Sequence, residues 1–140
     1  MAGKPVLDTI NCIPQRDERL PELYEGSLSS GEVLQRHLGT AHVVKAFNNV
    51  TFWHLASLAR SAGAPDCSAL PIAPDDPSPK AAVTRFLDTI GYDTVDAVTL
   101  GSGGRLFQFG TRAFVAPYGT LGDEQGTPAG VAAIRAALGL

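Results

Sequence analysis

Apolar and polar positions in the first 100 residues form short blocks with the periods of strands and helices in turn. Apolar runs that end in polar residues predict four buried strands, at 5–11, 42–49, 69–73 and 94–100. Apolar residues recurring every three or four positions predict helices between them, at 29–38, 52–59 and 78–90. This alternation through short connections indicates an α/β chain with parallel strands and right-handed crossovers.

Local signals set the ends of the expected elements. Ser29 and Glu32 form a capping box, so we expect the first helix to begin there. Ser78 is placed to cap the third helix, with Pro79 at the first helical position. Pro71 has no amide hydrogen, which predicts a sheet edge or a bulge in the third strand.

The remaining segments carry loop and turn signals. Residues 12–27 are polar and contain two prolines, and five charges lie between positions 16 and 22, so we expect a surface loop. Beyond residue 100 we expect a flexible glycine-rich loop at 101–104, an extended segment at 106–118 and a last helix with three inward residues, Val131, Ile134 and Leu138. The predicted fold class is α/β: a mostly parallel sheet of about four strands flanked by helices, with a C-terminal tail and helix. We assign 101–140 to the same domain as 1–100, as a tail able to cross to another subunit.

Composition and charge limit the classes of function. The chain of 140 residues suits one domain, and its contents of 44% apolar and 18% charged residues are ordinary. A net charge of −3 without a basic run argues against nucleic acid or an anionic membrane surface as a partner. Cys12 and Cys67 lie far apart, so we expect reduced thiols in a cytoplasmic chain.

Amide side chains follow two of the predicted strands. Asn11 and Cys12 come after the first strand, and Phe47, Asn48 and Asn49 come after the second. Parallel sheets bind ligands beyond the carboxyl ends of their strands, where amides can bond a carboxamide or a pyrimidine-like ring and Phe47 offers a flat apolar wall. The alternative is that these asparagines cap helices or form Asx turns, which is the commoner role of asparagine after a strand.

Other polar residues give weaker signals. Adjacent Asp75 and Asp76 fit a turn and a helix N-terminus better than a catalytic pair. The 101–106 segment follows a strand as a phosphate loop does, but no amphipathic helix follows it, although Arg105 is able to meet a phosphate. The three histidines, of which His54 beside Trp53 is a weak candidate for lining a cleft, lack metal-ligand spacing. We therefore assign no catalytic residue and no metal ligand.

Three strings in order carry a family resemblance: GKPVLDTIN at 3–11, VVKAFN at 43–48 and LPIAPDD at 70–76, with a further matching run from 80 to 96 and a looser match at 107–111. The chain resembles the NADPH-dependent coenzyme F420 reductase family and, in the same module, the cytosolic oxidoreductase domain of flavin-linked metalloreductases. The resemblance implies a Rossmann-like sheet and hydride transfer between a nicotinamide and a deazaflavin or flavin. NADP(H) and F420 or flavin are the implied cofactors, and the implied cofactor-binding residues are Asn11, Cys12, Phe47, Asn48 and Asn49.

The chain also departs from the family pattern. No G-x-G-x-x-G loop opens it, so the resemblance covers only the second half of the family's domain, over residues 1–100. Cys12 stands where the family has proline, Pro74 where it has glycine, and Asn49 where it has threonine. We expect an oxidoreductase-like chain that depends on a homodimer or a partner chain covering the exposed sheet edge, or alternatively a non-catalytic binding module. NADP against NAD, and F420 against flavin or a small substrate, stay open.

Overall fold

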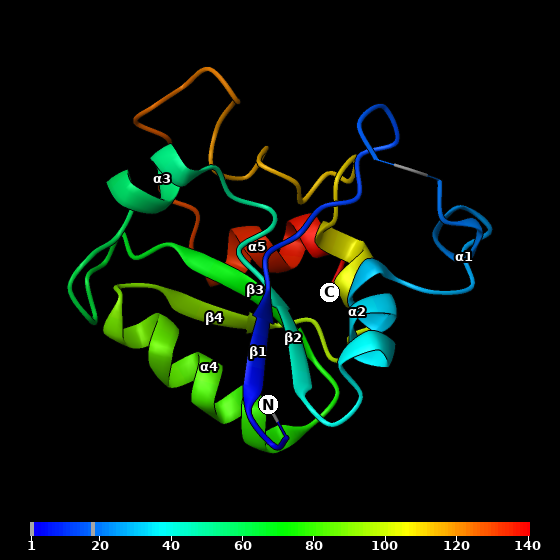
Figure 1. Cartoon of the computed structure of the whole chain (residues 1–140). Coiled ribbons are helices and arrows are strands. Elements are labelled where there is room, and N and C mark those ends of the chain that lie inside the picture. The colour runs from blue at the N-terminus through cyan, green and yellow to red at the C-terminus, as the bar shows by residue number, and fades with distance from the viewer. Residues whose placement is uncertain (1, 18) are drawn as a thin grey trace.

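The computed structural model of the chain describes residues 2–17 and 19–140. Met1, expected before the first strand, and Glu18, expected in the charged loop, lie outside the described residues. Figure 1 shows the elements in chain order: β1 Pro5–Asp8, α1 Pro21–Tyr24, α2 Ser30–Leu38, β2 His42–Ala46, α3 Phe52–Ser57, β3 Ala69–Pro74, α4 Pro77–Thr89, β4 Asp93–Asp96, the 3-10 helix η1 Gly104–Phe107, and α5 Val131–Leu138.

The four strands form one sheet in the spatial order β1-β2-β3-β4, which confirms the predicted α/β class. β1 pairs with β2 in parallel, and so does β3 with β4. The pair of β2 and β3 is antiparallel, so the sheet is mostly parallel, as predicted, with one antiparallel pair at its centre. The short helix α3 lies beyond the end of the sheet where β2 leaves it, rather than across a face (Figure 1). The chain therefore re-enters as β3 from that same end.

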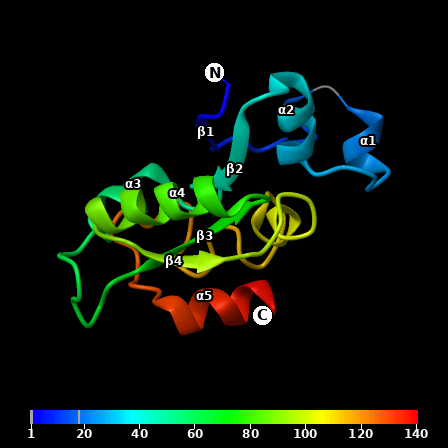
Figure 2. The ribbon, with the colours of Figure 1, turned by 90° about the horizontal axis from the view of Figure 1, so that it is seen from below.

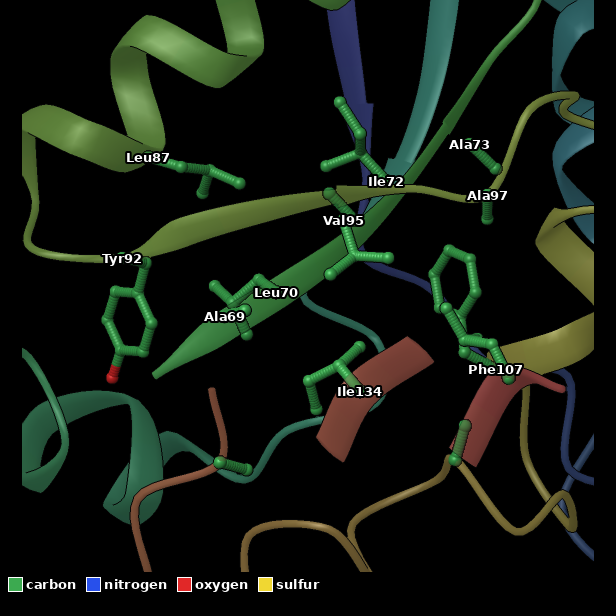
Figure 3. Packing of buried hydrophobic residues seen from close by; sticks show 14 of the residues in the cluster. Ala69, Leu70, Ile72, Ala73, Leu87, Tyr92, Val95, Ala97, Phe107 and Ile134 are labelled. Atoms are coloured by element: carbon green, nitrogen blue, oxygen red, sulfur yellow. The ribbon is translucent and has the colours of Figure 1, made fainter. Parts of the chain in front are cut away.

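Helices cover both faces of the sheet. α4 packs on one face, and α5 packs on the opposite face against β3 and β4 (Figure 2). The core lies between these layers: Leu87 of α4 and Ile134 of α5 approach the sheet from opposite sides, with Leu70 and Ile72 between them (Figure 3). Burying each such side chain contributes roughly 1.5–3 kcal/mol, so the two helices hold β3 and β4 firmly.

The predicted helices are present, but the first residue of α4 and the burial of one residue in α5 differ from expectation. The capping box of α2 is confirmed, because the Ser29 hydroxyl accepts from the Glu32 amide at 3.2 Å and the Ser29 amide donates to Glu32 Oε2 at 2.7 Å. α4 begins earlier than expected: Asp76, not Ser78, is its N-cap residue, and Pro77, not Pro79, is the first helical residue. In α5, Ile134 and Leu138 are buried as expected, whereas Val131 is 40% exposed in the first turn.

Pro71 lies in an interior strand, so the predicted edge or bulge is wrong. The carbonyls of Ser68 and Ile72 accept from the amides of β4 residues and their neighbours, which points the nitrogen of Pro71 away from β4. On that other side the register with β2 ends at Ile72. The proline is tolerated because its missing N–H falls where the neighbouring strand has already ended.

The segment after β4 folds back onto the chain's own sheet. Residues 106–118 are not extended, because they contain part of η1 and a series of turns. The Tyr118 hydroxyl donates to the Ala69 carbonyl at 2.8 Å, and the Ala69 amide donates to Ala129 at 2.8 Å. The tail thus supplies the hydrogen bonds that β2 does not give to the beginning of β3.

The cysteines, the helix lengths and the grouping of metal-ligating side chains bear on the remaining expectations. Cys12 and Cys67 are both free thiols. Within residues 2–17 and 19–140, no helix has the length and apolar character needed to cross a membrane, and no cluster of three histidine, cysteine or acidic side chains suits a metal ion.

Candidate functional site

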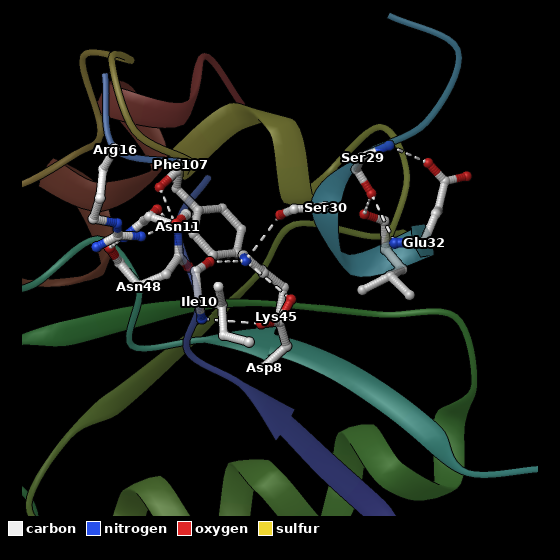
Figure 4. A network of polar contacts seen from close by, with 11 residues as sticks. Asp8, Ile10, Asn11, Arg16, Ser29, Ser30, Glu32, Lys45, Asn48 and Phe107 are labelled. Carbon is white, nitrogen blue, oxygen red and sulfur yellow. Dashed lines mark hydrogen bonds and ion pairs between the residues drawn. The ribbon is translucent and has the colours of Figure 1, made fainter. Parts of the chain in front are cut away.

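The residues that follow β1 and β2 meet, as the strand-end argument requires. The Asn11 side-chain amide donates to the main-chain oxygen of Asn48 at 2.6 Å. In return, Asn48 Nδ2 donates to Asn11 Oδ1 at 3.2 Å and to the Phe107 carbonyl at 3.0 Å (Figure 4). Two strand ends and the end of η1 are therefore joined by one pair of amides.

The carboxyl ends of β3 and β4 do not share this position, because those strands run in the opposite direction. The chain reaches the amide pair again through η1, which brings Phe107 to Asn48. The crevice at the strand ends is thus built by β1, β2 and η1, rather than by four strand ends together.

A buried ion pair, which the sequence motifs did not reveal, lies directly below the amides. Lys45 and Asp8 are partners in the β1–β2 register, 2.9 Å apart from Nζ to Oδ2, and both side chains are 1% exposed. Burial lowers the pKa of Lys45, and the neighbouring carboxylate of Asp8 opposes that shift. The available signal was one charge at the end of each apolar strand run, three positions before each asparagine.

Of the other predicted site residues, Phe47 and Asn49 lie away from the groove described next, whereas Cys12 stays beside Asn11. Phe47 adopts φ 64°, in the left-handed region, and its ring meets Phe86 edge-to-face at 6.3 Å. Asn49 is completely buried, and its amide donates to the Ala113 carbonyl at 3.0 Å, so it fastens the C-terminal segment and does not line the groove described next. Cys12 lies 3.7 Å from the Tyr24 hydroxyl.

An apolar groove of about 490 Å³ opens beside the amide pair, between the loop after β1 and α2. Asn11 and Cys12 are at its rim, and the side chain of Ile10 is 58% exposed at its lip. The apolar lining residues are Ile10, Leu20, Leu23, Val33 and Leu34. An apolar groove with a few polar groups, here including the amide of Asn11, is typical of a site for a flat organic ring.

Charged residues border the groove on the solvent side. Arg16 donates to the Asn11 carbonyl at 3.0 Å and to the carboxylate of Asp17. The hydrogen bond from Arg16 lowers the pKa of Asp17 to about 2, so the carboxylate stays ionised at neutral pH. Asn48 Oδ1, by contrast, is buried and has no hydrogen-bond partner among the described residues. Asn48 is not among the lining residues and reaches the groove through its hydrogen bonds with Asn11.

The glycine-rich segment after β4 does not form a phosphate cradle. The amides of Ser102 and Gly103 donate to the Thr99 hydroxyl, and the amide of Gly104 donates to the Thr99 carbonyl, so the loop uses its own donors. Arg105 lies 3.8 Å from Glu32. This agrees with the sequence, which lacked the helix that a phosphate loop requires.

The weaker polar candidates serve the fold. Asp75 accepts from the Leu100 amide at 2.8 Å, and Asp76 pairs with His42 at 2.8 Å. His54 is completely buried, and its Nε2 lies 2.5 Å from the Asp123 carbonyl, so it does not line the groove. The sequence could not place His54, because the segment that covers it lies about 70 residues away along the chain.

Solved structures similar to this chain include two with related sequences. A hypothetical protein from Sinorhizobium meliloti matches with a TM-score of 0.62 and 30% identity, over 82% of this chain and 54% of that one. A protein from Arthrobacter sp. FB24, provisionally described as an F420-dependent NADP reductase, matches with a TM-score of 0.54 and 26% identity, over 71% of this chain and 45% of that one. No family model and no curated protein matches the sequence.

The chain therefore spans about half the length of both solved proteins. The resemblance noted in the sequence has a counterpart in three dimensions: the fold is similar to that of an NADP-type oxidoreductase.

Proposed function

We propose that this chain is the ring-binding part of an NADP-type oxidoreductase, which holds a nicotinamide for hydride exchange with a deazaflavin or flavin. The observation that carries the proposal is the amide pair of Asn11 and Asn48 at the ends of two adjacent parallel strands, beside an apolar groove. Its similarity to the F420-dependent NADP reductase of Arthrobacter supports the same reaction class.

The residues fit the ring end of such a cofactor. A side-chain amide both donates and accepts, which matches the edge of a carboxamide, and Asn48 Oδ1 is an acceptor without a partner among the residues described. The groove walls are apolar, as the faces of an aromatic ring require. The pyrophosphate end has no such match, because the amides of the glycine-rich loop are already bonded to Thr99.

The chemistry asked of the chain is correspondingly modest. A bound nicotinamide and flavin supply the hydride donor and acceptor, and the protein supplies position and exclusion of water. Asn11 orients the ring edge and is itself held by Asn48, and Ile10 with the apolar wall of α2 shields one side from solvent. Proton transfer by a side chain is not needed for hydride exchange itself.

A second unit completes the site in this proposal. β1 pairs only with β2 among the described residues, which leaves its other edge free next to the groove. We propose that an α/β unit equivalent to the portion of the solved relatives outside this match pairs at that edge and carries the phosphate loop. A second copy of this chain is the other outcome, and light scattering of the chain alone detects it.

Calorimetric titration tests the proposal. We expect reduced nicotinamide mononucleotide, NADH and NADPH to bind the isolated chain with equal affinity, because only the ring they share is recognised. Asn11→Ala weakens all three, whereas Arg85→Ala, an exposed change on α4, weakens none. Absence of binding by all three up to roughly 10 mM contradicts the proposal and leaves the non-catalytic binding module.

A further inference from the structure

We infer that the buried pair of Asp8 and Lys45 is a clamp that fixes the main chain of Ile10, so that Lys45 is a positioning residue for the amide of Asn11. The inference deepens the proposed function and rests on it only for the ligand that Asn11 meets. The geometry of the clamp is independent of that ligand.

The clamp holds Ile10 from both of its main-chain polar groups. Its amide donates to Asp8 Oδ1 at 2.9 Å, and its carbonyl accepts from Lys45 Nζ (Figure 4). Asp8 Oδ2 in turn accepts from Lys45 at 2.9 Å, which closes a ring of three residues. The third N–H of the ammonium group donates to the Ser30 hydroxyl at 3.1 Å, at the beginning of α2. All three donors of Lys45 are used.

The pair is a poor choice if stability is its only role. Taking two charges out of water costs as much free energy as their attraction returns, and apolar residues of similar volume often do as well or better. Val43, two positions earlier on the same face of β2, and Ala73, the partner of Lys45 on β3, are buried, which shows that apolar residues fit this layer. The same loss of hydration makes protonation of Lys45 less favourable, which is why burial lowers its pKa.

The conformation of Ile10 agrees with a clamp. Its side chain is apolar but 58% exposed, although it belongs to the lining of the apolar groove. The two main-chain bonds hold the residue at the lip and leave the groove open. Asn11 follows directly and is bonded on its far side to Asn48, so the amide is fixed from two directions.

The decisive variant is Asp8→Val/Lys45→Met, which removes both charges and puts apolar side chains of similar size in their place. We expect urea unfolding to show equal or higher stability, because no charge is left unpaired. Hydrogen exchange of the Asn11 side-chain amide, followed by NMR, should become at least roughly tenfold faster as the segment opens locally. Affinity for reduced nicotinamide mononucleotide should fall by at least roughly fivefold through misplacement of the amide.

Two further variants keep the test sharp. Lys80→Met/Asp96→Leu removes a half-exposed ion pair on α4 and β4 and should leave Asn11 exchange unchanged. Lys45→Arg keeps the charge, but a planar guanidinium cannot place its donors on the same acceptors, so exchange at Asn11 should rise even if the double variant fails to fold.

Unchanged Asn11 exchange in whichever of these Lys45 variants folds overturns the clamp. If the native chain fails to bind the mononucleotide, the proposed function falls, while the exchange measurement still decides the clamp. Faster exchange with unchanged affinity also overturns the positioning role, because the amide then moves without consequence for the ring.

Discussion

The Asn11 side chain donates to the main chain of Asn48 across 37 positions of sequence, and Asn48 returns a hydrogen bond to Asn11. Each asparagine follows a strand, and the two strands are parallel neighbours. The contact therefore brings two distant sequence positions together next to an apolar groove. It also implies that neither asparagine is only a local turn residue, since each has a long-range partner.

Asn48→Ala and Asn49→Ala are expected to lower the free energy of unfolding by similar amounts, but only Asn48→Ala should weaken ligand binding. Asn48 satisfies the Phe107 carbonyl, and Asn49 satisfies the Ala113 carbonyl, so each change leaves a buried acceptor unpaired and lowers the free energy of unfolding by about 1–3 kcal/mol. Binding of reduced nicotinamide mononucleotide per folded molecule should fall only for Asn48→Ala. Equal binding losses in the two variants, measured by calorimetry, contradict the position assigned to Asn49.

Val98→Gly should stabilise the chain. Val98 is a β-branched residue at φ 77° and is 64% exposed, so its side chain gains little burial while its backbone sits in the left-handed region. That region costs a non-glycine residue roughly 1–2 kcal/mol, of which glycine's greater freedom in the unfolded chain returns about 0.5–1 kcal/mol. Val131→Gly, an exposed valine in the first turn of α5, is the control and should destabilise the chain. A lower free energy of unfolding for Val98→Gly than for the native chain, measured in urea, contradicts the conclusion that the Val98 backbone is strained.

Gly103→Ala is expected to be costly for a steric reason. A Cβ at this position would lie 1.9 Å from the Ala97 carbonyl oxygen and 2.5 Å from that of Thr99, so the turn after β4 must move. Overpacking of this kind lowers the free energy of unfolding by about 1–3 kcal/mol or more. Gly122→Ala meets no atom within 4 Å and should stay within about 0.5 kcal/mol of the native chain. Thermal melting of both variants checks the contrast.

Stability should fall in strong alkali because of two tyrosines. Tyr92 donates to the Leu55 carbonyl and Tyr118 to the Ala69 carbonyl. Burial raises the pKa of Tyr92 to about 12 and also raises the pKa of Tyr118. The unfolded chain loses these protons near pH 10, while the folded chain keeps them, so the free energy of unfolding decreases from about pH 10 to 12.

Tyr92→Phe isolates one of these groups. The slope of the free energy of unfolding against pH should become shallower by up to about 1.4 kcal/mol per pH unit in that range. Lys45 acts with the opposite sign below about pH 10.5: its lowered pKa means that the unfolded chain binds the extra proton, so its contribution rises with pH. The free energy of unfolding is measured by urea titration at several pH values. If its slope against pH is the same in Tyr92→Phe as in the native chain, Tyr92 is not a cause of the alkaline loss of stability.

Short-range patterns in the sequence determined which residues form strands and helices. The capping box at Ser29 and the apolar periodicity of α4 act within a few positions and appear in the structure, whereas β1 and β2 each end three residues earlier than predicted, at Asp8 and Ala46. The placement of Asn11 and Asn48 at strand ends follows from the same local information.

Tertiary packing decided the rest. The antiparallel pairing of β2 and β3 depends on where α3 lies relative to the sheet, which no local period encodes. The separation of Asn48 from Asn49 depends on the left-handed turn at Phe47, which interrupts the alternation of side chains expected for a strand. The pairing of Asp8 with Lys45 appears only once two strands align in register, because their attraction becomes specific when both charges leave water together.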